Sequence, residues 1–95
     1  MNSERKGQIV AGGGLQLISD DGRFKYILVP YTVLHEGSVA KSFIARCFVR
    51  DGAQWQPTTT LRTYPNPTLF IQDLRRSEGN VFSAALTNLQ EHEEI

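Results

Sequence analysis

The sequence contains a single cysteine, Cys47, and this scarcity excludes an internal disulfide. It also lacks an apolar run long enough to span a membrane, and no signal-peptide pattern opens the chain. Together these absences predict a protein of a reducing compartment, the cytoplasm, that has no membrane partner.

An excess of charge is missing as well, because ten Lys and Arg residues balance ten Asp and Glu residues. This balance argues against bulk electrostatic capture of nucleic acid or of an anionic membrane. It also removes the net repulsion that keeps small proteins apart, so we expect self-association as a homodimer. The ligand spacing of a metal site is absent too, and we expect neither a metal nor a cofactor.

The composition is that of a globular protein, with 40% hydrophobic and 21% charged residues in a chain of 95. This length corresponds to a single domain with a modest core. We expect residues 1–8 to be flexible because they are polar. We also expect residues 92–95 to fray, because their acidic side chains lie at the negative pole of the predicted last helix.

The first two thirds of the chain contain segments rich in β-branched and aromatic residues, separated by the turn signals "DDG", "HEGS" and "DG". Gly12-Gly13-Gly14 would weaken a strand and predicts a loop or bulge. Pro30 predicts a bulge, an edge segment or a strand break, and Pro57 predicts an edge strand. We expect four strands, at residues 15–19, 24–34, 39–50 and 53–64.

From Pro65 onward the pattern favours helices. Asn66 is suited to cap a helix that begins with Pro67, Gly79 could end this helix, and Asn80 could cap another. An alternative interpretation makes 69–76 and 81–87 a further hairpin. The helical interpretation rests on an apolar stripe at i, i+3, i+4 and i+7, formed by Phe82, Ala85, Leu86 and Leu89.

These elements predict an α+β fold: an antiparallel meander of about four strands with C-terminal helical segments packed on one face. A two-residue loop at Asp21-Gly22 would pair Ser19 with Phe24, Leu17 with Tyr26, and Leu15 with Leu28. Opposed residues share a face, so these apolar side chains form the core face. Lys25 would then point to the other face, near Ile18 and Ile27.

The same argument at Asp51-Gly52 pairs Val49 with Gln54, Phe48 with Trp55, and Arg46 with Pro57. One face then collects Val39, Phe43, Ala45, Cys47 and Val49 as core. The opposite face interleaves cations with aromatic rings, a combination suited to base stacking or to an anionic peptide. Alternatively, the 69–76 segment covers this face, or Phe48 and Trp55 form a simple cross-strand aromatic pair. The candidate binding residues are Lys25, Arg46, Phe48, Arg50 and Trp55.

The stretch "ISDDGRFKYILV" followed by "AKSFIARC" resembles the front half of the janus/ocnus family of phosphohistidine phosphatases, over residues 15–50. The resemblance implies that Lys25 helps to hold a substrate phosphate, with Arg46 as the arginine of the second strand. The family's catalytic histidine has no counterpart in "DGAQWQPTTT", and its later Gly-Gly-Gly-Arg motif is missing. The resemblance therefore implies a phosphatase-like protein that lacks activity.

Other candidate sites have simpler explanations. The glycine run lacks the helix of a phosphate-binding loop, Cys47 lies in a strand without a flanking base, and His35 is next to Glu36 in a turn. We therefore predict a small non-enzymatic binding module that uses the basic and aromatic face on a nucleic-acid or protein partner. A regulator or inhibitor is a further hypothesis, and the phosphatase-like protein is the alternative.

Overall fold

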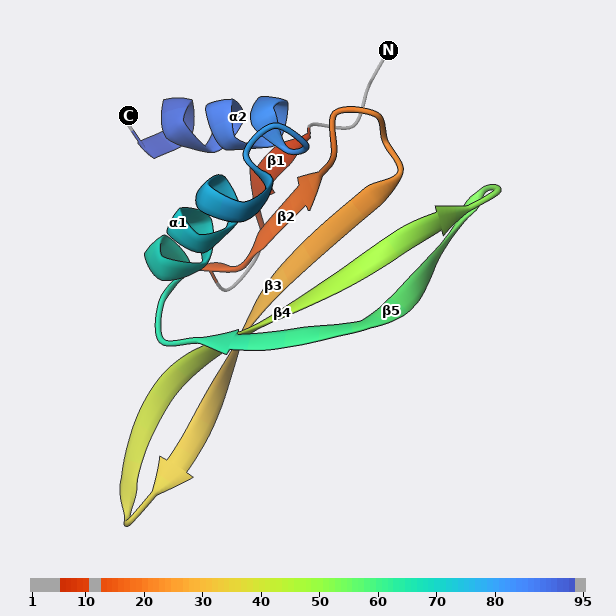
Figure 1. Ribbon diagram of the computed structural model, residues 1–95. Coiled ribbons are helices and arrows are strands. Elements are labelled where there is room, and N and C mark those ends of the chain that lie inside the picture. The colour runs from red at the N-terminus through yellow and green to blue at the C-terminus, as the bar shows by residue number, and fades with distance from the viewer. Residues whose placement is uncertain (1–5, 11–12, 94–95) are drawn as a thin grey trace.

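The computed structural model describes residues 6–10 and 13–93, and these form an α+β fold, as the sequence predicts (Figure 1). An antiparallel sheet in the simple order β1-β2-β3-β4-β5 is followed by two helices. The elements are β1 (Gly7–Ile9), β2 (Leu15–Ile18), β3 (Phe24–His35), β4 (Ser38–Asp51), β5 (Gln54–Tyr64), α1 (Pro67–Glu78) and α2 (Ser83–Glu93).

The register of β2 against β3 is the predicted one, with Leu15 opposite Leu28 and Leu17 opposite Tyr26. The turn between the two strands is stabilised by Ser19, whose buried hydroxyl accepts hydrogen bonds from the N–H groups of Arg23 and Phe24. The core face predicted for this hairpin is therefore confirmed.

The sheet has one strand more than the predicted four. Residues 7 and 8, which we expected to be flexible, belong to β1, which pairs with β2 from Gly7 opposite Leu17 to Ile9 opposite Leu15. Gly7 permits this arrangement because a side chain there would collide with the backbone of Ala85 in α2. A three-residue strand that is placed by β2 and by a helix distant in the sequence has no local periodic signal.

The register predicted for β4 against β5 is wrong. Trp55 lies opposite Arg50, and Phe48 lies opposite Pro57, because the turn residues are Gly52 and Ala53 instead of Asp51 and Gly52. A bulge then shifts the register again between Arg46 and Phe48. Each shift moves the pairing by an even step, so every side chain keeps its predicted face although its partner changes.

The segment after Pro65 is helical, and the alternative hairpin is wrong. Asn66 caps α1 as predicted, since its side chain accepts a hydrogen bond from the N–H of Leu69 at 2.9 Å. The cap of α2 differs from the prediction. Asp20, in the β2–β3 turn, accepts hydrogen bonds from the hydroxyl of Ser83 and the N–H of Ala84, so Asn80 is not needed.

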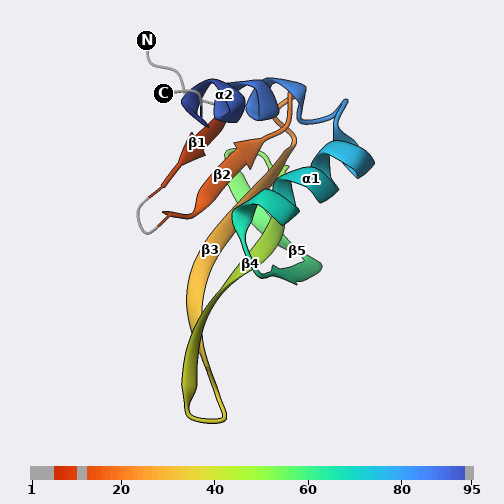
Figure 2. The same ribbon diagram turned by 90° about the vertical axis from the view of Figure 1, so that its left-hand side faces the viewer.

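The core lies between one face of the sheet and the two helices, which cover the same side (Figure 2). Phe70 and Phe82 contribute the largest buried rings, and Tyr26 packs against both of them at centroid distances of 5.7 and 5.4 Å. The predicted helical stripe of α2 is buried here. The core residues are Leu15, Leu17, Tyr26, Leu28, Phe43, Ala45, Cys47, Phe70, Ile71, Leu74, Phe82, Ala85, Leu86 and Leu89.

The far halves of β3 and β4 project beyond the sheet as a two-stranded hairpin (Figures 1 and 2). We call residues 30–42 the arm, since Phe43 pairs with Tyr64 of β5 and belongs to the core. It begins at Pro30, since β2 pairs with β3 only as far as Leu28. Pro30 therefore marks an edge segment, one of the three predicted options. The arm ends in a tight turn with positive φ at Glu36 and Gly37.

Candidate functional site

The five candidate binding residues lie on the side of the sheet that faces away from the helices. We call this side the open face. It also carries apolar side chains from the neighbouring positions of the strands, and no described helix packs on it (Figure 2). Its residues are Lys25, Ile27 and Val29 on β3, Ile44, Arg46, Phe48 and Arg50 on β4, and Trp55 and Leu61 on β5.

Trp55 is the centre of the charged part of this face. The Lys25 ammonium lies 4.7 Å from the centroid of its ring, and the Arg50 guanidinium lies 4.5 Å from it. Lys25 also lies 5.5 Å from the ring of Phe48. Contacts of this kind contribute about 0.5–1 kcal/mol each at exposed sites, so together they hold the two cations in place. The predicted pairing of Phe48 with Trp55 is replaced by this cation–aromatic arrangement.

Arg50 is positioned by the backbone as well. Its Nε donates a hydrogen bond to the Gly22 carbonyl at 3.2 Å, and its own N–H donates to the Arg23 carbonyl at 2.8 Å. The β2–β3 turn therefore fixes Arg50 beside Trp55. The remaining N–H donors of a guanidinium stay available for a carboxylate or phosphate, because the group carries five.

An apolar hollow adjoins the cations. It has a volume of about 320 Å³ and is lined by Ile27, Val29, Ile44, Arg46 and Phe48. Arg46 is exposed at its rim, and Val29 is 42% exposed. The open face thus combines fixed positive charge with accessible apolar surface, and the two are contiguous through Phe48.

Lys25 is half-buried, and its cross-strand partner Ile18 is 2% exposed. The sequence places Ile18 on the same face as Lys25, but the structure shows that Ile18 itself is buried. The accessible part therefore excludes Ile18, and it runs from exposed Arg50 and half-buried Lys25 and Trp55 toward the arm.

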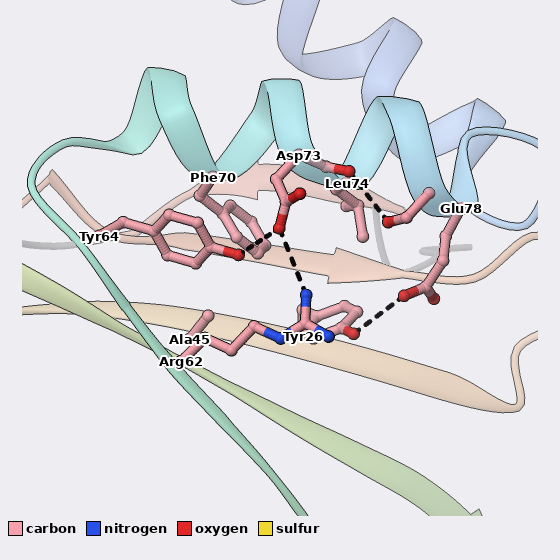
Figure 3. Close-up of a pocket in the computed structure, with 9 residues that line it drawn as sticks. Tyr26, Ala45, Arg62, Tyr64, Phe70, Asp73, Leu74 and Glu78 are labelled. Carbon is pink, nitrogen blue, oxygen red and sulfur yellow. Dashed lines mark hydrogen bonds and ion pairs between the residues drawn. The ribbon is translucent and has the colours of Figure 1, made fainter.

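A second group of polar residues joins α1 to the core side of the sheet (Figure 3). The hydroxyl of Tyr64 donates to Asp73 at 2.7 Å, Arg62 contacts the same carboxylate oxygen at 3.3 Å, and the hydroxyl of Tyr26 donates to Glu78 at 3.1 Å. Burial raises the pKa values of Tyr26 and Tyr64 above the usual range, and the neighbouring carboxylates raise them further. Both phenols therefore stay protonated and act as donors.

The space among these residues is only about 10 Å³, which leaves no room for a substrate. This group therefore holds α1 on the sheet. Sequence reasoning missed it, since Tyr64 and Asp73 form no recognisable motif. Their contact depends on where α1 begins and how it crosses the strands.

The other candidates from the sequence have structural explanations. Gly13 is in the loop between β1 and β2, where its N–H donates to the Val10 carbonyl, and Gly12 lies outside the described residues. Cys47 is buried, and this burial raises the pKa of its thiol. His35 is exposed at the tip of the arm, and its Nε2 lies 3.8 Å from Oε2 of Glu36. No group of three or more His, Cys, Asp and Glu side chains suited to a metal occurs within the described part of the chain.

The fold and the open face define a small α+β domain with a helix-covered core face and an uncovered basic and apolar face. No protein-family model, curated protein or solved structure matches the chain. The resemblance to the janus/ocnus family therefore stays a prediction. Among the described residues, no helix is long and apolar enough to cross a membrane.

Proposed function

We propose that the protein is a non-enzymatic binding module whose open face takes an acidic protein segment with an apolar side chain next to the acidic residue. The observation that carries this proposal is the stacking of Lys25 and Arg50 on Trp55, next to the apolar hollow. A carboxylate would meet the cations, and the apolar side chain would enter the hollow.

Local charge supports an anionic partner although the net charge is zero. Lys25, Arg46 and Arg50 lie on one face of neighbouring strands, and the potential near a surface depends on such clusters more than on the total. Guanidinium groups form bidentate hydrogen bonds with carboxylates. The face therefore has donors suited to Asp or Glu side chains.

The aromatic rings favour a protein segment over nucleic acid as the partner, because cations already lie against them. Binding of single strands relies on aromatic faces on which bases stack. The ring of Trp55 has Lys25 and Arg50 close to its centroid, and Phe48 also has Lys25 near it. A base would have to displace these cations, whereas a carboxylate would bind to the remaining guanidinium donors of Arg50 without displacing either cation.

The test uses fluorescent peptides that alternate Glu with Leu or Phe, and a thymidine oligonucleotide of similar charge, with anisotropy as readout. We expect the peptide to bind more tightly. Lys25→Ala and Arg46→Ala should each weaken peptide binding about three- to tenfold, which is the range of one exposed charge contact. Lys41→Ala on the arm is the matched control and should leave binding unchanged, because Lys41 is exposed on the other side of β4.

Tighter binding of the oligonucleotide, weakened by the same substitutions, would show a nucleic-acid module instead. Lys25→Ala should also lower the free energy of unfolding by about 1–2 kcal/mol, because it removes the contacts of Lys25 with the rings of Phe48 and Trp55. A loss of about 3 kcal/mol or more would mean that Lys25 mainly stabilises the sheet, and its binding role would fall.

The phosphatase-like alternative is supported by one observation, since Lys25 and Arg46 share the open face on neighbouring strands. The phosphate-binding role that the resemblance implies for them would use the same cations. Release of phosphate from a phosphohistidine peptide, lost in Lys25→Ala, would favour this alternative over the binding module.

We also propose that the protein acts in the cytoplasm as a homodimer. Zero net charge supports self-association, because two copies do not repel one another over long distances. Light scattering at tens of micromolar should give a mass above the 10.7 kDa of one chain. A monomer mass throughout that range would contradict the proposal.

A further inference from the structure

The edges of the sheet differ in how well they are protected. Exposed strand edges pair readily with other chains, and proteins usually block them with proline, bulges, charges or a covering element. The edge at β1 adjoins α2, whose Ala85 lies against Gly7. The edge at β5 contains Pro57 and a bulge that begins beyond it. Both ends of the five-stranded sheet are therefore blocked.

The arm has two further edges, and they are protected in different ways. Its β4 edge carries Lys41, a charged residue of the kind that blocks pairing. Its β3 edge lies in the stretch "YILVPYTVL", residues 26–34, which contains no charged residue and is rich in β-forming side chains. Pro30 blocks only the inner end of this edge, and Thr32 and Leu34 beyond it keep their N–H groups. Leu34 at the end of this stretch is 74% exposed.

The backbone groups that face outward on this edge follow from the alternation of an antiparallel strand. The Arg23 carbonyl accepts from β4, whereas the Phe24 carbonyl accepts from Ser19 on the β2 side. Even-numbered residues of β3 therefore direct their N–H and C=O groups away from β4. Beyond Leu28, where β2 has ended, Thr32 and Leu34 present these groups to the outside.

We propose that the β3 edge of the arm pairs antiparallel with the same edge of a second copy, around a two-fold axis at Thr32. This inference names the surface for the proposed homodimer and is independent of the acidic-peptide site.

A second copy is the partner that the residues fit. With Thr32 opposite Thr32 of the second copy, Val33 would face Tyr31 and Leu34 would face Pro30. Every pair is uncharged, and the apolar side chains meet one another. Pro30 lacks an N–H, but its carbonyl can still accept from Leu34 of the second copy. A two-fold contact of this kind closes on itself and adds no further copies.

The pairing is short, and this decides its strength. Five residues of a strand span about 17 Å, so the contact covers less than the roughly 800 Å² per partner of a standard stable interface. We therefore expect a dimer that forms at tens of micromolar and dissociates on dilution.

Proline substitutions on the two edges of the arm test the surface. Thr32→Pro removes an outward N–H and should weaken dimerisation at least about tenfold in sedimentation velocity, because proline cannot donate to a strand pair. Lys41→Pro is the matched control, since Lys41 lies opposite Thr32 and its N–H faces the other edge of the arm. It should leave the dimer intact. Circular dichroism melts check that both variants fold.

Cross-linking gives a second readout that does not depend on proline. In Thr32→Cys the two cysteines would face each other with Cα atoms about 5.5 Å apart, within the range of a disulfide. Mild oxidation should then give a covalent dimer, whereas Lys41→Cys and the wild type, with its buried Cys47, should stay unlinked. A wild-type dimer that survives Thr32→Pro and is not cross-linked through Thr32→Cys would overturn the proposed edge while leaving the homodimer. A monomer at every concentration would overturn both.

Discussion

Leu28 and Leu34 lie on the same strand and on the same side of it, yet one is 0% exposed and the other is 74% exposed. The same contrast occurs on β4, where Ala45 is 1% exposed and Val39 is 70% exposed. The strand is continuous between these positions, so its backbone is not the cause. The difference is the layer above it, because the core formed with α1 and α2 includes Leu28 and Ala45 but not Leu34 or Val39.

The comparison shows that apolar character by itself does not define a core. A strand residue is buried only where another layer covers it, and a two-stranded hairpin has no such layer of its own. The body and the arm should therefore differ in local stability. Segments with few buried contacts open at low free energy, whereas core segments open only with the whole domain.

The largest expected contrast is in thiol accessibility. Cys47 in the body should react with a thiol reagent only through opening of the core, so its labelling should be at least about a thousandfold slower than that of a free thiol. In the variant Leu34→Cys, the added thiol on the arm should react at once. The measurement is absorbance during labelling in native buffer, with denatured protein as reference. Rapid labelling of Cys47 in the wild type would mean that the body is as open as the arm.

Leucine truncation gives the next largest contrast. Leu28→Ala should reduce the free energy of unfolding by about 2–5 kcal/mol, because it leaves a cavity in a packed core. Leu34→Ala should change it by less than about 0.5 kcal/mol, since an exposed side chain leaves no cavity. Urea denaturation measures the free energy of unfolding of both variants, at a protein concentration below that at which the dimer forms. Similar losses in the two variants would show that the arm is covered within one chain.

The smallest expected effect concerns the cap of α2. Asp20→Ala should cost about 1 kcal/mol, the typical value for a lost N-cap. Hydrogen bonds from Ser83 and Ala84 lower the pKa of Asp20 in the folded protein. Its contribution is therefore fully present above the pKa of the unfolded chain, about 3.9, and is lost as the pH falls through the lower folded value.

The difference in the free energy of unfolding between wild type and Asp20→Ala should accordingly shrink as the pH is lowered from neutral to strong acid. Urea titrations at each pH measure it. Glu36→Gln removes an exposed carboxylate from the arm and serves as the control. It should have no comparable effect at any pH. If this difference in the free energy of unfolding stayed constant across the acid range, a stabilising role of the ionised Asp20 carboxylate as the cap of α2 would be excluded.

Much of the fold could be predicted from local signals. The Asp21-Gly22 turn and the alternation around it predict the pairing of Leu17 with Tyr26, and the spacing of Phe82 to Leu89 predicts α2. The faces of Lys25, Arg46, Phe48, Arg50 and Trp55 were also predictable, since side chains alternate along a strand. The cross-strand partner of Trp55 was not predictable, because it depends on which two residues form the turn between β4 and β5. The partner is Arg50, whereas the prediction was Phe48.

The sequence by itself determined the kinds of elements, their order and the two faces of each strand, because these depend on periodicity and on the residues of the turns. Only the tertiary structure decided which face the helices cover, how far they reach along β3, and that Asp20 caps a helix more than sixty residues away in the chain. These depend on contacts between segments that are distant in sequence, and no local pattern records them. Leu28 and Leu34 carry the same side chain on the same strand, and only the layer above separates core from surface.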